Sequence, residues 1–461
     1  MVNGHSRAEA RRIRRDIYGL ILPSVLQNIL EIGVGVLTTA IIGRLLADDI
    51  SAKGICERIV QFDWALFRGL GTGAMLIFAH AYGANLLQKC REIAGQAYLI
   101  CIPLALALVA VIWAVPRPLL ELMADEESVL IRAVPYLRTL VLSSPLTAVM
   151  SVNTAVFNGR GDTRTPMFIA VAMNGINVVG CYLLVFGLGS FHGLGLIGSA
   201  YSVILSKGVA SLAGLWLIWG RRGCFPPAGT AKERRLHLDV SVAAEVFAGG
   251  LPVAAETLFW QFSTIVVSRA IFSYGSDTYA AYLLGLQAET LLQAPAFGFS
   301  VASMTLCSFA IAKRDDRLYR NYIKQMLVMA GVIALVTTPV LWFGSSQFLL
   351  LLTDKLYLVP IGAGYVSMMA IGQPAQTIAP VLNGVLRAAN HKKTPMISTA
   401  SGIWLVRVPI IILTAFVLHG SIYVVWFAIA IDQVFRLAIS TAFFLRFKVQ
   451  NAALLGKASG G

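Results

Sequence analysis

The sequence Asn158-Gly-Arg-Gly-Asp-Thr-Arg-Thr-Pro-Met167 is a short polar stretch between two long apolar runs. Far downstream, Arg387-Ala-Ala-Asn-His-Lys-Lys-Thr-Pro-Met396 repeats its plan. In each stretch we expect one helix to end, a cationic turn to follow and Thr-Pro-Met to open the next helix. Proline suits the first position of a helix, because the amide that it lacks would have no partner there.

The two prolines, Pro166 and Pro395, define a separation along the sequence that we call the repeat offset. The same offset relates other landmarks of the chain. Leu22-Pro23 near the first apolar run matches Leu251-Pro252, and Gly73 matches Ala302. A constant offset across three separate predicted helices is typical of a duplicated sequence. The chain is therefore predicted to consist of two homologous bundles of helices.

The composition is that of a membrane protein. Hydrophobic residues make up 57% of the 461 residues and charged residues only 13%, whereas a soluble domain carries about 25% charged residues. Most of the apolar runs reach the roughly 20 residues that a helix needs to cross a bilayer. The six cysteines have neither disulfide nor metal-binding spacing, so no redox function is predicted.

The fold class predicted is an all-α integral membrane protein with twelve transmembrane helices in two six-helix lobes related by pseudo-twofold symmetry. The N-lobe is expected over residues 1–220, a cytoplasmic linker over 221–241 and the C-lobe over 242–461. An even number of spans per lobe leaves both lobes in the same orientation, with a substrate path between them. The spans are expected near residues 18–45, 54–84, 92–115, 132–158, 165–188, 194–220, 243–274, 278–312, 318–347, 357–386, 395–418 and 421–446.

Lysines and arginines are distributed unevenly among the connections between these spans. Twenty-five lie in the two termini, in the connections that share their side or at the adjoining ends of spans, against three in the alternate connections. Because such an excess marks the cytoplasmic face, we expect both termini to be cytoplasmic and the protein to lie in the inner (cytoplasmic) cell membrane. The formal net charge of +14 then mostly reflects the lysines and arginines of the cytoplasmic face. No nucleic-acid partner is expected.

Six stretches stand in a recognisable order and spacing. They are Gly69-Leu-Gly-Thr-Gly-Ala74 with Tyr82-Gly-Ala84, Gly159-Arg-Gly-Asp-Thr-Arg-Thr-Pro166 with Asn174 and Asn177, Gly250-Leu-Pro-Val-Ala-Ala-Glu256, Gly298-Phe-Ser-Val-Ala302, Leu386-Arg387 before Thr394-Pro395, and Trp404-Leu-Val-Arg407-Val-Pro409. Together they resemble the multidrug and toxic compound extrusion (MATE) family of secondary transporters over nearly the whole chain. The resemblance implies two six-helix lobes, a V-shaped cavity between them, and export of organic molecules driven by inward flow of H⁺ or Na⁺.

Three glutamates inside predicted spans are candidates for coupling transport to an ion, because a carboxylate within a membrane is costly and tends to be functional. Glu31 lies deep in the first span, Glu256 follows Pro252 by about one turn, and Glu289 lies one span later. A purely structural, hydrogen-bonded role is the alternative for each. A carboxyl group removed from water favours its neutral form until water or a cation reaches it, so its charge can follow the conformation.

The chain departs from the family pattern at the positions of familiar aspartates. By resemblance, an aspartate of the first helix falls on Thr38, one of the fifth helix on Cys181 and one of the tenth near Gln376. Glu31 lies about two turns before Thr38 on the same helix face, so we expect either that Glu31 replaces the missing acid or that coupling has moved to the C-lobe. What remains for an N-lobe ion site is one hydroxyl and three amides: Thr38, Asn153, Asn174 and Asn177.

A single glutamate can carry a proton, whereas Na⁺ prefers several oxygen ligands, so the isolated acids favour H⁺ as the coupling ion, and no other cofactor is expected. Lys207 is expected to snorkel or to pair with an acid, and Arg407 to pair with another group or to cap a break in the eleventh helix. Other side chains are candidates for lining a cavity that takes flat cationic molecules, with a lipid-facing position as the alternative for the aromatic ones. They are His80, Phe259, Trp260, Phe297, Gln287 and Gln376.

The leading function is ion-coupled export of amphipathic, often cationic organic compounds by rocking of two lobes. The alternative is a flippase for a lipid-linked or polyprenyl-linked substrate, although the scattered cations of the spans form no pattern that would hold one. An enzyme is not expected, because the sequence shows neither a catalytic constellation nor a Walker-type phosphate loop. The expected partners are small organic substrates and the lipid bilayer, with the protein itself a monomer.

Overall fold

The computed structural model describes residues 2–45, 47–121, 126–188, 191–220, 224–225, 240–352 and 355–447. Over these residues the chain is helical except for the connections and one pair of antiparallel strands of two residues each, β1 (Gly187–Leu188) and β2 (Phe191–His192). This confirms the all-α prediction. The chain packs as two compact units. We call Leu26–Ala254 the N-unit, and Met1–Val25 with Ala255–Gly461 the C-unit.

Two long helices, α1 (Val2–Ile42) and α9 (Val240–Phe272), each contribute to both units. The N-unit also contains α2 (Ala47–Gly83), α3 (Leu87–Ala114), α4 (Pro116–Glu121), α5 (Glu127–Val141), α6 (Ser144–Gly159), α7 (Arg164–Phe186) and α8 (Leu196–Trp219). The C-unit adds α10 (Ser276–Ala312), α11 (Asp316–Leu352), η1 (Leu356–Leu358), α12 (Val359–Ala388), α13 (Thr394–Ser401), η2 (Gly402–Arg407), α14 (Val408–Ile412), η3 (Leu413–Val417) and α15 (Ile422–Arg446).

Within the described part of the chain, ten helical spans are long and apolar enough to cross a membrane. The pair α5 and α6 makes an eleventh if it is one bent span. The remaining predicted span, 54–84, lies within α2, whose polar residues, Asp63 and Arg68 among them, make it less apolar than the others. Of the predicted linker 221–241, only residues 224–225 and 240–241 are described.

The duplicated polar stretches form the same turn in both units. Gly161 and Asn390, which the repeat offset relates, both adopt left-handed backbone, with φ of 81° and 66°. In each copy the next amide, of Asp162 or His391, donates to the carbonyl five residues earlier at 2.9 Å. Glycine and asparagine suit this conformation, which closes a helix and satisfies its last carbonyl groups. The same offset relates a second left-handed pair, Asn85 and Arg314.

The two units exchange the first parts of α1 and α9. A Cβ atom at Gly298 of α10 would lie 2.9 Å from the carbonyl oxygen of Ile21, so α1 and α10 are in backbone contact within the C-unit. In the N-unit a Cβ atom at Gly69 of α2 would lie 2.8 Å from the carbonyl oxygen of Gly250 in α9. The repeat offset relates these two contacts as well, and glycine permits both. The predicted lobe boundaries, at residues 220 and 242, therefore follow the sequence repeat. The packed units divide the chain elsewhere, after Val25 and after Ala254.

The span predicted as one helix over 132–158 is broken, so that prediction was wrong in its continuity. Helix α5 ends at Val141 and α6 starts at Ser144, with a bend of 41° between them. Pro145 explains the break, because it lacks the amide that would bond to the carbonyl of Val141, and its ring crowds that carbonyl. The break places Ser143 and Ser144 near the middle of the span.

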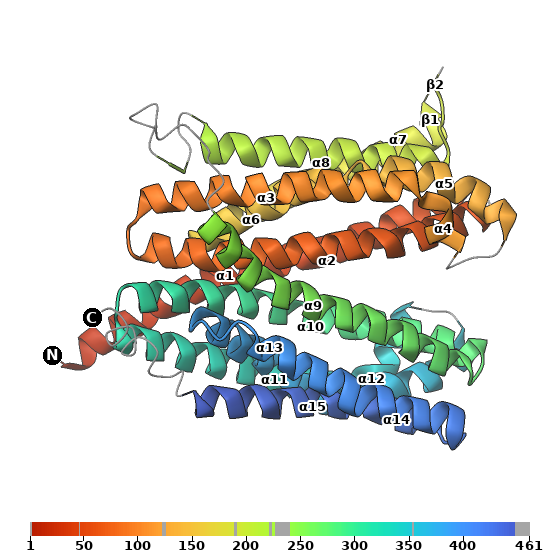
Figure 1. The fold of residues 1–461 in the computed structure, drawn as a ribbon. Coiled ribbons are helices and arrows are strands. Elements are labelled where there is room, and N and C mark those ends of the chain that lie inside the picture. The colour runs from red at the N-terminus through yellow and green to blue at the C-terminus, as the bar shows by residue number, and fades with distance from the viewer. Residues whose placement is uncertain are drawn as a thin grey trace. The chain divides into compact units, whose positions relative to one another are not determined.

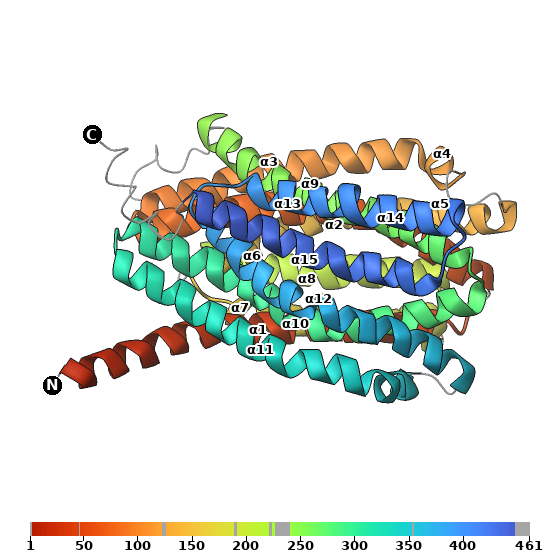
Figure 2. The same cartoon turned by 90° about the horizontal axis from the view of Figure 1, so that it is seen from below.

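The eleventh predicted span, 395–418, is also irregular. It is continuous from α13 to η3, but η2 and η3 are π-helical, with wider turns than an α-helix. Pro409, the second residue of α14, lies just after η2 and removes one amide from the hydrogen-bond ladder. Such π-helical turns are frequent at functional sites. In both views α13 and α14 lie alongside α15 (Figures 1 and 2).

The core of the C-unit is built on a row of fully buried aromatic rings. Tyr365 of α12 contacts Tyr282 of α10 with ring centroids 5.0 Å apart, and Trp426 of α15 at 6.0 Å, both edge-to-face. Such pairs are stabilised by the opposite charges of ring edge and ring face. The packing fixes the ring of Tyr365, whose hydroxyl group points to a buried acid.

Candidate ion-coupling and substrate site

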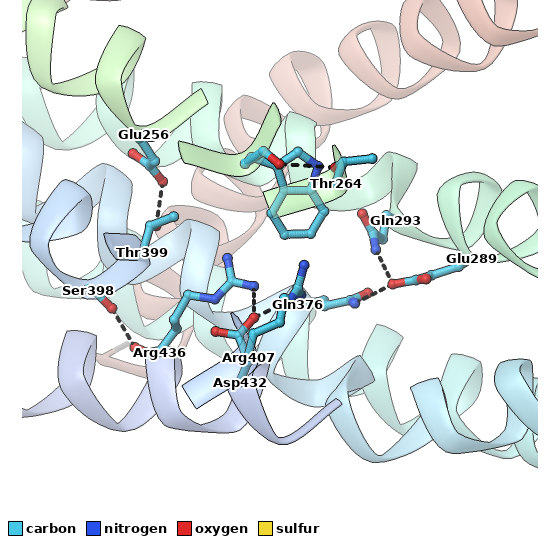
Figure 3. A network of polar contacts seen from close by, with 11 residues as sticks. Glu256, Thr264, Glu289, Gln293, Gln376, Ser398, Thr399, Arg407, Asp432 and Arg436 are labelled. Carbon is cyan, nitrogen blue, oxygen red and sulfur yellow. Dashed lines mark hydrogen bonds and ion pairs between the residues drawn. The ribbon is translucent and has the colours of Figure 1, made fainter. Parts of the chain in front are cut away.

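Polar side chains of α9, α10, α12, α13, η2 and α15 in the C-unit form groups of contacts (Figure 3), which together with Arg387 and Tyr365 we treat as one network in three parts. Its first part surrounds Glu256 of α9. Arg387 at the end of α12 donates to Glu256 Oε2 at 2.5 Å, and the hydroxyl of Thr399 in α13 donates to Oε1 at 3.0 Å. The Glu256 side chain is 23% exposed and that of Arg387 9%. Glu256 is thus the least buried acid of the network.

The second part is a fully buried ion cluster around Asp432 of α15, which is 0% exposed. Arg407 lies 2.8 Å and Arg436 2.6 Å from the same oxygen, Oδ2. A Cβ atom at Gly402 would overlap Asp432 Oδ1 and the side chain of Arg436, so η2 has to present a glycine here. Arg407 was expected either to pair with another group or to cap a helix break, and it pairs with this acid.

Trp260 of α9, four residues after Glu256, packs against the second part. The guanidinium carbon atoms of Arg407 and Arg436 lie 4.6 and 5.3 Å from the centre of its ring. Cation–π attraction of this kind is strongest over tryptophan and grows when the pair is removed from water. In this structure the cations over Trp260 therefore belong to the protein, and an organic cation at this ring would have to compete with them.

The third part surrounds Glu289 of α10, which is 3% exposed. Gln293 and Gln376 donate to Oε1 at 2.8 and 2.7 Å, and Tyr365 donates its hydroxyl proton to Oε2. Three donors from two helices satisfy this carboxylate, as a buried polar group requires. Gln376, which was predicted for the substrate cavity, is buried and bonds to Glu289.

The predicted N-lobe residues each bond to other partners. Among the described residues, no hydrogen bond joins Thr38, Asn153, Asn174 and Asn177 to one another. Thr38 donates to the carbonyl of Val34 in its own helix at 2.9 Å. Asn153 accepts from Tyr98 at 2.5 Å, and the side chain of Asn177 accepts from Ser202 at 3.1 Å. These contacts tie neighbouring helices together and give Asn153 and Asn177 a place in packing.

Asn174 is the exception, because it is 6% exposed and its Nδ2 has no partner among the described residues. Glu31 has an exposed side chain in α1, and the charges of Arg68 and Lys207 act on it. Lys207, which was expected to snorkel or to pair with an acid, donates to the hydroxyl of Thr147 at 2.9 Å. Glu31 is thus the one predicted N-lobe residue that belongs to a charged cluster.

The remaining predicted cavity residues lie in varied surroundings. His80 is in the last turn of α2, away from the middle of the span. Gln287 is exposed, on a different face of α10 from the buried Glu289. Phe259 and Phe297 are partly buried. Nothing in this placement groups the four side chains.

Four functional candidates were absent from the predicted site: Asp63, Arg387, Asp432 and Arg436. Asp63 and Asp432 lie inside predicted spans, 54–84 and 421–446. The rule that singled out the glutamates, that an acid within a membrane span is a functional candidate, applies equally to them. Arg387 was visible as part of the repeated turn, but its acid partner lies 131 residues earlier.

The fold and the site define a class: a multi-pass membrane protein with two units that each contain charged residues deep within their helices. Such intramembrane charges mark substrate or ion pathways. A family model named MatE matches residues 23–183 and 252–413, so that the two matches start at positions related by the repeat offset. The chain therefore belongs to the MatE family of transporters, as the sequence resemblance had indicated.

Curated relatives match along nearly their full length. A probable multidrug resistance protein NorM of Thermotoga maritima is 24% identical over 97% of this chain and 96% of its own. An uncharacterized transporter of Bacillus subtilis, YisQ, is 21% identical over 91% of each chain. A probable multidrug resistance protein of the same organism, YoeA, is 23% identical over 89% of each chain.

Solved structures share the fold. A MOP superfamily transporter from Pyrococcus furiosus, described as having a binding pocket of reverse polarity, superimposes with a TM-score of 0.86 at 16% identity, over 95% of this chain and 96% of its own. The outward-facing conformation of a multidrug resistance MATE family transporter gives the same values. The twelve-helix, two-lobe membrane fold is thereby confirmed.

Proposed function

We propose that this chain exports amphipathic, often cationic organic compounds in exchange for H⁺, by rocking of its two lobes in the inner cell membrane. The observation that carries the proposal is the ion pair of Glu256 and Arg387. It lies inside the helices of the C-unit, yet Glu256 remains 23% exposed. A carboxyl group that water can reach, but that a buried cation holds, changes charge when either contact changes. Such a group can couple protonation to conformation.

The partners of Glu256 favour H⁺ over Na⁺. A guanidinium group occupies one of its oxygen atoms at 2.5 Å, and a single hydroxyl group contacts the other. A sodium ion at this carboxylate would be repelled by the guanidinium group of Arg387 and would have to compete with it for the carboxylate oxygens. A proton needs only one oxygen atom. It would neutralise Glu256 and release Arg387.

The flippase alternative depends on free cations that would hold a phosphate or pyrophosphate group. The C-unit does contain two buried arginines, Arg387 and Arg407, and the partly buried Arg436. Each of them lies against a carboxylate of the same unit. This pairing favours the exporter, since the acids would repel a phosphorylated substrate.

The coupling ion can be tested with purified protein in liposomes loaded with a fluorescent organic cation such as ethidium. We expect a pH gradient alone to drive ethidium movement, and a Na⁺ gradient alone to leave it at the rate of protein-free liposomes. Sodium-driven movement without a pH gradient would contradict proton coupling. Movement under neither gradient would contradict ion-coupled export of this class of compound.

The predicted topology can be tested at Cys224, which follows α8 in a connection expected to be cytoplasmic. Cys224 is partly exposed, whereas the other five cysteines are buried, so the unmodified protein carries one reporter. A membrane-impermeant maleimide should leave Cys224 unlabelled in intact cells and label it after permeabilisation. Labelling in intact cells would place this connection outside.

The same thiol should show a defined pH dependence. Burial raises the pKa of Cys224, and the nearby Arg160 lowers it in part. Because the thiolate is the reactive form, a raised pKa makes labelling slow at neutral pH and faster as the pH rises. Labelling rates measured between pH 7 and 9 in permeabilised membranes should therefore increase throughout this range.

A further inference from the structure

Lysines and arginines gather near the starts of α1 and α11, on the membrane face that is expected to be cytoplasmic. Residues 11–17 and 313–324 together carry nine lysines and arginines but only three aspartates. The turn over 158–166, which is expected on the same face, carries two cations and one acid. Both cationic segments belong to the C-unit. We call them together the cationic end of the C-unit.

Hydrogen bonds hold the two segments of the cationic end against each other. Tyr322 of α11 donates its hydroxyl proton to Asp16 Oδ2 at 3.2 Å, and Arg14 Nε donates to Gln325 Oε1 at 3.3 Å. Next to these contacts Ile17 is fully buried. The packing of α1 on α11 therefore keeps positive charges of both helices close together although they repel one another.

The aspartates of the cationic end have other partners than most of its cations. Asp16 bonds to the tyrosine hydroxyl, Asp315 accepts a backbone amide of the first turn of α11 at 2.9 Å, and Asp316 forms an ion pair with Arg320 at 2.9 Å. In the part of the chain that the structure describes, three exposed cations form no ion pair: Arg11, Arg15 and Lys324. Their side chains remain available to a negatively charged partner.

On α1 the exposed cations continue into apolar surface. Arg11, Arg15, Tyr18 and Leu22 follow one another at intervals of three or four residues, which places them on one face of the helix. All four side chains are exposed. Tyrosine is enriched at the level of the lipid headgroups in membrane proteins, and Tyr18 stands between the arginines and the leucine. We call this face the α1 stripe.

Helix α11 repeats the arrangement. Lys324 is followed at the same intervals by Val328, Val332 and Leu335, which are between 53% and 75% exposed. We call this face the α11 stripe. Both stripes lie on helices that are long and apolar enough to cross a membrane. Each stripe thus leads from exposed cations to exposed apolar side chains within the same helix.

A ligand that fits a whole stripe has a negative head and an apolar tail. Arginine and lysine bind phosphate oxygens through charge-assisted hydrogen bonds, and clusters of them at the cytoplasmic end of a membrane helix are typical of sites for anionic lipids. A soluble anion would leave the apolar part of each stripe uncovered. A phospholipid without net charge would leave the cations uncompensated.

We propose that the cationic end of the C-unit binds the headgroups of anionic phospholipids, whose acyl chains lie along the α1 stripe and the α11 stripe. The bound phosphates offset the repulsion between the cations of the two helices. The lipid thereby stabilises the packing of the first part of α1 on the C-unit. This inference goes beyond the proposed export function and depends neither on the exported compound nor on the coupling ion.

The inference predicts that an anionic lipid stabilises the purified protein more than a neutral lipid with the same acyl chains. The full chain in detergent is titrated with dioleoylphosphatidylglycerol or with dioleoylphosphatidylcholine, and its melting temperature is measured at each concentration. A ligand of the folded state raises this temperature as its concentration increases. We expect phosphatidylglycerol to act at lower concentrations than phosphatidylcholine, and added salt to weaken its effect.

A triple variant, Arg11→Gln with Arg15→Gln and Lys324→Gln, removes exposed cations without touching the contacts that join α1 to α11. Each cation near an anionic lipid surface contributes about fivefold to binding. The apparent affinity for phosphatidylglycerol should therefore fall on the order of a hundredfold in the triple variant, and about fivefold in Lys324→Gln alone. Without added lipid the melting temperature should not fall, because the removed charges repel one another.

A second triple variant is the matched control. It removes the same number of exposed cations from other connections that are expected to be cytoplasmic, by Lys89→Gln, Arg164→Gln and Lys393→Gln. Its net charge equals that of the first triple variant. It should keep the wild-type response to both lipids.

Three results would overturn the inference. The first is equal stabilisation of the wild-type protein by the two lipids. The second is an equal loss of response in both triple variants, because net charge rather than the cationic end would then determine binding. The third is stabilisation by inorganic phosphate at the concentrations at which phosphatidylglycerol acts, which would assign the cations to a soluble anion. Ethidium movement in liposomes is measured separately, so the export function can stand when this lipid site fails.

Discussion

Glu256→Gln is expected to reduce pH-gradient-driven efflux to the rate of passive leak while the protein still folds. Glutamine keeps the size of the side chain, and its oxygen still accepts one of the bonds that Arg387 and Thr399 now donate. The other of these two hydrogen bonds is weakened, and we expect the free energy of unfolding to fall by roughly 1 kcal/mol as a result. Glutamine cannot take up a proton, so the coupling is lost entirely.

Efflux from liposomes and thermal unfolding in detergent, measured on the same preparations, would check this expectation. Glu289→Gln is the matched control, because this residue is sealed among three donors. There an amide would place an N–H group against a donor, at a cost of about 1–3 kcal/mol in stability, with a milder effect on transport. Normal pumping by both Glu256→Gln and Glu31→Gln would exclude a mechanism based on these carboxylates.

Asp432→Ala is expected to be the most destabilising single substitution in the C-unit. It leaves Arg407 and Arg436, with side-chain exposures of 4% and 13%, without their shared carboxylate. Removing one partner of a buried ion pair typically costs about 3–5 kcal/mol, because the remaining charge is uncompensated. We expect a marked fall in melting temperature and in the yield of folded protein.

A second substitution can distinguish this cause from a simple loss of volume. Replacing one of the two cations as well, in Asp432→Leu with Arg407→Met, should recover part of the lost stability, since fewer buried charges remain. Glu121→Ala, which removes an exposed ion pair with Arg117, should leave the melting temperature unchanged. A double variant as unstable as Asp432→Ala would show that the ion cluster does not determine the loss.

The repeat and the membrane class could be predicted from the sequence because both depend on local patterns. The repeat offset found at Pro166 and Pro395 reappears in backbone angles and in the hydrogen bonds of the turns. The helix ends at these two turns could be predicted from the same residues. The break before α6 was missed, although Pro145 was a visible signal, because apolar length outweighed it in reading 132–158 as one span.

The pairing of charges could not be predicted, because partners come together through packing of distant helices. Glu256 was singled out correctly as an acid within the membrane, but its contact with Arg387 spans 131 residues of chain. Asp432 and Asp63 escaped notice for a different reason. Both were visible within predicted spans, but the rule for intramembrane acids was applied to the glutamates alone.

The exchange of the first parts of α1 and α9 has a consequence for how the chain is made. Residues 1–25 leave the ribosome well before their packing partners in the C-unit, which begin at Ala255. The N-unit in turn is incomplete until residues 240–254 have been synthesised. Contacts between segments so far apart in sequence form late and slow the folding of a chain. Neither unit can therefore complete its packing before part of the other has been synthesised. If the chain were cut in the 221–241 segment, each fragment would carry residues that pack in the unit formed mainly by the other fragment.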